Sequence, residues 1–132
     1  MPVLVNETGE PGQILAVTAE TLYLVNLLLA PGLGFVLLFV LFLARREDAP
    51  PLAANHLSQT VGASILGGVL IVLIIGLILL LGGFDSGYTW MVVILYFTFV
   101  HSSLIFMGVI GLVKALSSQH FVYPLIGRPF RS

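Results

Sequence analysis

Long apolar runs, separated by short charged or turn-forming segments, dominate the pattern of this chain. The longest uncharged run lies between Asp48 and Asp85, and its second half consists almost entirely of Leu, Ile, Val and Gly. A bilayer core about 30 Å thick needs roughly 20 apolar residues of helix to cross it. Lipid offers no partner for an unpaired backbone N–H or C=O, so the segment must be helical. The pattern predicts a central membrane-spanning helix over about 57–83.

Two further runs flank the central one. There are 24 uncharged residues between Glu20 and Arg45, and 28 between Asp85 and Lys114. We therefore expect an all-α integral membrane protein with three transmembrane helices, at about 20–44, 57–83 and 88–116. These helices form one domain over 20–116, with an N-terminal segment at 1–19 and a tail at 117–132. Pro31, between Ala30 and Gly32, predicts a kink within the first helix.

Basic residues predict the orientation. With three spans, one side receives every Lys and Arg of the chain, namely Arg45, Arg46, Lys114, Arg128 and Arg131. Basic residues in short loops favour the cytoplasmic side. We expect the N-terminus outside, the C-terminal tail in the cytoplasm, and the protein in the inner (cytoplasmic) membrane of a bacterium.

Composition narrows the function. The chain is 58% hydrophobic and only 8% charged, whereas soluble domains average about 25% charged residues. It has no cysteine and a net charge of −1, which excludes thiol chemistry and gives nucleic-acid binding no support. No catalytic triad, phosphate loop or metal-ligand spacing is present in the sequence. We expect no enzymatic activity and no nucleic-acid partner.

Small residues at helical spacing mark the faces where helices can approach closely. Helix-packing positions are predicted on the second and third spans, at Ala63, Ser64, Gly67, Gly68, Gly76, Leu104, Gly108, Gly111 and Ala115. These faces pack against each other within the monomer or against a partner protein, and the sequence does not choose between the two.

His101 lies near the middle of the third predicted span, where an ionisable side chain needs a partner. It is predicted to form an interhelical hydrogen bond, to Asn26, to Thr98 or to a carbonyl freed at Pro31. The alternatives are a proton relay, or an axial ligand to haem or a chlorophyll-type pigment. No other cofactor and no metal site is expected.

The start of the second span carries a second polar cluster. Asn55 is predicted to cap this helix, and His56 follows it at the cytoplasmic end.

Three features together resemble a known family: the Arg-Arg-Glu-Asp loop with Asn55-His56, the Lys114-Ala115 end of the third span, and the closing Tyr-Pro-Leu-Ile-Gly-Arg at 123–128. The pattern resembles small bacterial membrane proteins related to the Tic translocon protein of the plastid inner envelope. The resemblance covers roughly 33–128 and implies a fold, but no activity.

We therefore expect a small accessory or scaffolding subunit of a larger membrane complex, which acts by lateral helix packing among other integral membrane proteins and lipid. Its tail would contact a partner or anionic lipid heads through Tyr123, Pro124 and Arg128. The rival hypothesis is a transport or translocation component, in which an oligomer forms a polar path near Asn26, Pro31 and His101. A cofactor-binding subunit with His101 as ligand is the third hypothesis.

Overall fold

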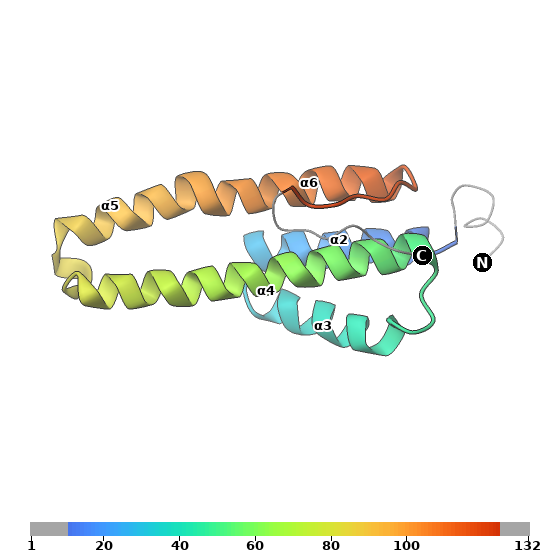
Figure 1. Ribbon diagram of the computed structural model, residues 1–132, viewed down its shortest axis with the longest axis horizontal. Coiled ribbons are helices and arrows are strands. Elements are labelled where there is room, and N and C mark those ends of the chain that lie inside the picture. The colour runs from blue at the N-terminus through green and yellow to red at the C-terminus, as the bar shows by residue number, and fades with distance from the viewer. Residues whose placement is uncertain (1–10, 125–132) are drawn as a thin grey trace.

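The computed structural model describes residues 11–124, and all regular structure in this range is helical (Figure 1). This confirms the prediction of an all-helical chain for the described region. In chain order the elements are α2 (Gln13–Leu28), α3 (Leu33–Arg45), α4 (Pro51–Leu80), the 3₁₀ turn η1 (Gly83–Asp85), α5 (Gly87–Leu95), the π-helical turn η2 (Tyr96–His101) and α6 (Ser102–Leu116).

Two helical segments are long and apolar enough to cross a membrane. They are α4 and the continuous α5–η2–α6 segment, each of 30 residues. Pro50 and Pro51 set the start of α4, since proline suits the first turn of a helix. At its other end Gly82 and Gly83 take φ angles of 100° and 77°, which reverse the chain into α5. These two segments correspond to the second and third predicted spans.

The first predicted span, about 20–44, is not one kinked helix. It is a hairpin of two antiparallel helices, α2 of 16 residues and α3 of 13 residues, joined at Pro31 (Figure 1). At 1.5 Å per residue these helices are about 24 and 20 Å long, which is shorter than a bilayer core of about 30 Å. The prediction of a continuous first span was wrong because a proline–glycine pair permits a reversal as readily as a bend.

Asn26 closes the tip of this hairpin. Its side-chain Oδ1 accepts the backbone N–H groups of Gly32 at 2.8 Å and Phe35 at 3.0 Å, so the start of α3 is satisfied from α2. Gly34 lies so close that an added Cβ would be 2.7 Å from the Asn26 backbone. The two helices can therefore turn tightly without leaving these donors unpaired in an apolar medium.

The hairpin brings the start of α2 to the same end of the molecule as the end of α6. Gln13 donates its side-chain N–H to the Leu116 carbonyl at 2.8 Å. An added Cβ on Gly12 would lie 3.1 Å from Ala53, near the start of α4. The start of α2 and the end of α6 thus lie at the same end of the molecule, whereas the three-span prediction places the N-terminal segment and the C-terminal tail on opposite sides of the membrane. That prediction follows from three spans, because an odd number of crossings places the two ends of a chain on opposite sides.

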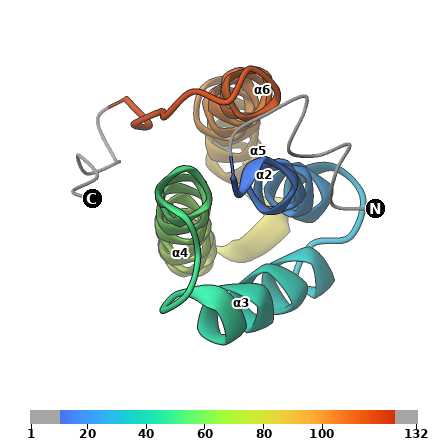
Figure 2. The ribbon, with the colours of Figure 1, turned by 90° about the vertical axis from the view of Figure 1, so that its right-hand side faces the viewer.

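The helices are unevenly distributed along the molecule. Viewed from the end where α2 begins, α2 packs against α3, α4 and α6 (Figure 2). The other half consists of α4 and α5 alone, closed by the turn at 81–87 (Figure 1). We call the half that contains the α2–α3 hairpin the proximal half, and the half formed by α4 and α5 the distal half. The buried side chains gather in the proximal half, around Ala16, Ala19 and Tyr23 of α2.

The topology can be tested by cysteine labelling, because the chain has no cysteine of its own. We expect Pro11→Cys and Glu47→Cys, both at exposed positions, to react with a membrane-impermeant maleimide from the same side of the membrane. Asp85→Cys should react only from the other side. Labelling of Pro11→Cys and Glu47→Cys from opposite sides would instead restore a three-span topology.

The role of Asn26 gives a second prediction. Asn26→Leu removes the acceptor of two backbone N–H groups, and each buried unpaired donor costs about 1–3 kcal/mol. We expect the free energy of unfolding in detergent to fall by about 2–4 kcal/mol by the same reasoning. Thr21→Leu, at an exposed position of the same helix, is the control and should change stability little. Equal stability of the two variants would show that the hairpin does not depend on this cap.

Candidate functional site, a buried glutamate–histidine pair that holds the tail

Glu20 of α2 and His56 of α4 form an ion-pair contact inside the proximal half. Both side chains are fully buried, and His56 Nδ1 lies 2.5 Å from Glu20 Oε2. Two ionisable groups this deep are tolerated only when they are paired and hydrogen-bonded, because an isolated buried charge is very costly. This pair is therefore the electrostatic centre of the fold.

The second ring nitrogen of His56 fixes the number of protons in the pair. His56 Nε2 lies 2.8 Å from the Gln119 backbone carbonyl, which can only accept, so Nε2 carries a hydrogen. The short contact between Nδ1 and Glu20 then contains one further proton. Whether that proton belongs to the imidazole or to the carboxyl group, the pair has no net charge. The pair is thus compatible with burial as long as it holds this one shared proton.

The tail after α6 folds back onto the start of α4, and three polar side chains of α4 bind its backbone. Asn55 binds Phe121 twice, donating to its carbonyl at 3.0 Å and accepting its N–H at 2.8 Å. The Gln59 Oε1 atom accepts the N–H of Tyr123 at 3.1 Å. With His56 on Gln119, α4 holds the segment 119–123 against its own first turns.

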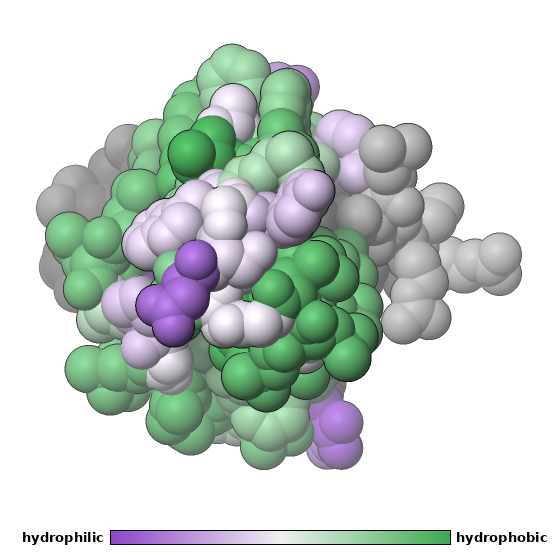
Figure 3. Space-filling view, turned by 90° about the vertical axis from the view of Figure 1, so that its left-hand side faces the viewer, coloured by the Kyte–Doolittle hydropathy of each residue, from purple (hydrophilic) through white to green (hydrophobic). Residues whose placement is uncertain are grey.

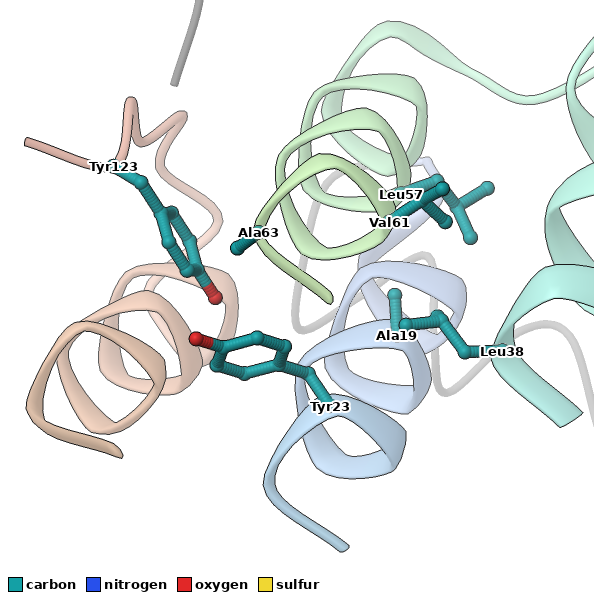
Figure 4. Packing of buried hydrophobic residues seen from close by; sticks show 7 residues of the cluster. All are labelled: Ala19, Tyr23, Leu38, Leu57, Val61, Ala63 and Tyr123. Atoms are coloured by element: carbon teal, nitrogen blue, oxygen red, sulfur yellow. The ribbon is translucent and has the colours of Figure 1, made fainter. Parts of the chain in front are cut away.

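Tyr123 links this tail to the buried pair. Its hydroxyl donates to Glu20 Oε1 at 2.6 Å, and its ring packs edge-on against Tyr23 with centroids 5.4 Å apart. Figure 4 shows the two tyrosines, one from the tail and one from α2, pointing toward each other. Burial, and then the neighbouring Glu20 carboxylate, raise the pKa of the Tyr123 hydroxyl far above its ordinary value. It therefore stays protonated and remains a donor.

Two glycines of α6 make room for these α2 side chains. A Cβ on Gly111 would lie 2.5 Å from Glu20 Oε1, and a Cβ on Gly108 would lie 2.7 Å from the Tyr23 ring. Tyr23 in turn donates its hydroxyl to the Leu104 carbonyl at 3.0 Å. The small-residue face of α6 therefore packs on α2, a contact that the sequence analysis did not consider.

The remaining predicted packing positions differ in how deeply they are buried. Ala63 is buried, and Gly67 is buried with an added Cβ 3.5 Å from Leu104. Ala115 is also buried, near Ala16 and Leu52. Ser64 is half-buried, and its hydroxyl has no hydrogen-bond partner within residues 11–124. Gly68 and Gly76 face outward, with nothing within 4 Å of an added Cβ.

His101 lies apart from the buried pair, at the end of the π-helical turn. Its ring packs against Phe97, with centroids 5.2 Å apart, and against Tyr96 at 6.4 Å. It is half-buried. The predicted hydrogen-bond partner Asn26 directs its oxygen to the hairpin turn instead. Axial ligation of haem or pigment by His101 stays a prediction.

The residues predicted for tail contact and for a polar path lie in unexpected surroundings. Tyr123 is fully buried, so its side chain is not at the surface where a partner or lipid head would meet it. Pro124 is exposed, and Arg128 lies outside the described residues. Two members of the predicted path, Asn26 and Pro31, shape the hairpin tip.

Sequence reasoning missed the centre of this site. Glu20 was treated as a charge at the end of a span, and Asn55 as a helix cap. The structure buries Glu20 and starts α4 at Pro51, four residues before Asn55. One signal was present: Glu20 is the only charged residue in the stretch 13–44, which predicts a buried, paired carboxylate. Its partner could not be read from the sequence.

What this arrangement can do is hold a proton and a chain segment. Within residues 11–124 no group of three His, Asp or Glu side chains is placed to bind a metal ion. The fold and the site thus define a small helical membrane protein whose buried polar centre locks its own tail. The chain belongs to the MamF/MmsF family, described as the magnetosome magnetite crystal formation protein family, whose family model matches residues 13–130. No curated protein and no solved structure matches it.

This membership corrects one prediction and supports only the coarser part of another. The resemblance to relatives of the plastid Tic translocon protein was wrong, because the matching family model is that of the magnetosome proteins. The motifs quoted for it, such as Asn55-His56 and the Tyr-Pro-Leu tail, instead contain residues that bind the tail in this fold. A membrane location agrees with the family, but the specific assignment to the inner membrane does not follow from it.

The buried pair predicts a marked loss of stability on removing one partner. His56→Leu leaves the Glu20 carboxyl group buried without its partner, and such changes cost about 3–5 kcal/mol. We expect that loss in the free energy of unfolding, together with faster proteolysis within 119–124. Ser58→Leu, at an exposed position of the same helix, should have neither effect.

The double variant Glu20→Leu/His56→Leu should be more stable than His56→Leu alone, because it removes the buried carboxyl group that has lost its histidine and leaves only the Tyr123 hydroxyl without its acceptor. If the loss of unfolding free energy in the double variant equalled the sum of the losses in Glu20→Leu and His56→Leu, the pairing would be contradicted.

Proposed function

We propose that the protein is a non-catalytic accessory subunit of the magnetosome membrane that supports magnetite crystal formation through contacts with neighbouring membrane proteins. The family membership supports the setting. Lateral helix contact is supported by the way the chain uses its polar groups. Most of the polar side chains of the proximal half described above are engaged within the protein.

The proposal rests on how few charged and polar groups the distal end exposes. The charged residues Arg45, Arg46 and Lys114 lie at the proximal end, which the positive-inside rule assigns to the cytoplasm. The distal end would then face the crystal. Figure 3 shows this end as a small hydrophilic area surrounded by apolar surface. Within 81–90 the only charged residue is Asp85.

Three other polar side chains of this turn, those of Ser86, Thr89 and Trp90, take part in closing it. The Thr89 hydroxyl donates to the Gly83 carbonyl at 2.5 Å, and Trp90 Nε1 donates to Phe84 at 3.0 Å. Ser86 accepts the N–H of Tyr88 at 3.2 Å. A single carboxylate is a weak surface for binding iron ions or a crystal face, since hard cations are held by several oxygen ligands. The membrane-embedded faces are therefore the larger means of interaction.

The outward glycines of α4 are the proposed contact. Gly68 and Gly76 lie exposed on one side of the helix, where a neighbouring helix can approach the backbone closely. Because an added side chain meets nothing within 4 Å in the monomer, larger residues there should leave the fold intact.

This can be tested in a magnetosome-forming bacterium whose own copy of the gene is deleted. We expect Gly68→Leu/Gly76→Leu to change the size distribution of magnetite crystals in electron micrographs, with the protein still present in the membrane. Val72→Leu, on the same exposed face but without filling a glycine position, is the matched control. Asp85→Asn should leave the crystals unchanged. If Asp85→Asn alone reproduced the deletion, direct contact with the mineral would replace the proposal.

A further inference from the structure

The α2–α3 hairpin makes the two halves of the molecule unequal in width. The proximal half contains α2, α3, α4 and α6, whereas the distal half contains α4 and α5 (Figures 1 and 2). α4, with 30 residues, is about 45 Å long and can cross the bilayer. α2 and α3, at about 24 and 20 Å, reach only part of the way. A bilayer with its headgroups is about 40–45 Å thick, so a hairpin whose open end lies at the headgroups ends near the midplane and occupies mainly one leaflet.

The surface of the hairpin fits acyl chains. Its only charged residue before Arg45 is Glu20, which is fully buried. The outer face of α3 is apolar and at least half exposed at Leu33, Val36, Val40 and Leu43. The tip is closed by Asn26, which pairs the N–H groups of Gly32 and Phe35, donors that would be costly to leave unpaired in hydrocarbon.

Charged and aromatic residues indicate how deep the helices lie in the membrane. Arg45 and Arg46 end the hairpin, and Lys114 ends α6, so the open end of the hairpin lies at the headgroups. At the distal end the exposed rings of Tyr88 and Trp90 begin α5, a usual position for aromatic side chains at the opposite interface. Between these two levels the hairpin adds width on one side only.

We propose that the protein is a lipid-embedded wedge that favours curved membranes, with its wide proximal half in the convex leaflet. A helix is about 10 Å across, so two additional helices enlarge the cross-section of that leaflet by about 160 Å². A compartment enclosed within the cytoplasm has its cytoplasmic leaflet on the convex side, and the basic residues assign the wide half to that leaflet. The inference rests on the fold and takes only this orientation from the proposed function.

The experiment uses vesicles of phosphatidylcholine and phosphatidylglycerol with a broad range of diameters, containing the full chain labelled at Glu47→Cys. Protein density per lipid is measured on single vesicles, and an impermeant quencher reports which molecules have residue 47 outside. These molecules should be several-fold denser on small vesicles than on large ones. Molecules in the opposite orientation should show the reverse trend. Equal density at all diameters in both orientations would overturn the wedge and leave the proposed function untouched.

Paired substitutions at exposed positions test the cause. Val36→Trp/Val40→Trp widens the proximal half and should strengthen the preference for small vesicles. Val72→Trp/Leu79→Trp widens the distal half and should weaken it. All four positions are more than half exposed, so neither change disturbs the core. Shifts in the same direction would overturn the proposal. The proposal would also be overturned if the preference for small vesicles appeared only at protein densities at which copies associate, because contacts between α3 helices of different copies would then explain it.

Discussion

The absence of hydrogen-bond partners in lipid is the constraint on which this structure depends. Backbone polar groups and ionisable side chains that enter the apolar region need partners within the chain. Asn26 satisfies this requirement at the hairpin tip, where it pairs two backbone donors from the following helix. Glu20 and His56 satisfy it at the proximal end by sharing one proton between two groups that would be costly to bury singly.

The buried pair also determines the arrangement of the helices around it. Glu20 can meet His56 only if α2 lies against α4, and it fits beside α6 only because Gly111 has no side chain. Tyr123 then brings the tail into the same cluster. The close approach of α2 to α4 and α6 and the folded tail thus share one cause. Substitutions in this cluster are expected to act on the whole proximal half rather than on one contact.

The two ends of the molecule differ in kind, and this difference connects fold with function. The proximal end carries Arg45, Arg46 and Lys114 together with the polar centre and the hairpin, whereas the distal end is a tight turn with one carboxylate, Asp85. For a member of a magnetite crystal formation family, this asymmetry favours action on the membrane and its proteins over action on the mineral itself. The wedge shape and the outward glycines of α4 are two ways in which such a protein can act without catalysis.

The sequence by itself determined the helical class and the location of the two long helices, α4 and the α5–η2–α6 segment. Their uncharged runs are long enough to cross a bilayer, and proline or glycine marks their ends. The small-residue faces were also visible in the sequence, although the partner of each face was not. All of these properties depend on neighbours a few residues apart, which is why a linear pattern reveals them.

Only the tertiary structure decided whether Pro31 bends a span or reverses it, and where Glu20 lies. The reversal depends on Asn26 reaching Phe35, nine residues later, and on the close approach at Gly34. The position of Glu20 depends on His56, 36 residues away, and on Tyr123, 103 residues away. A local pattern contains no record of such pairings, because the free energy that selects them comes from burial and arises only when the helices are packed.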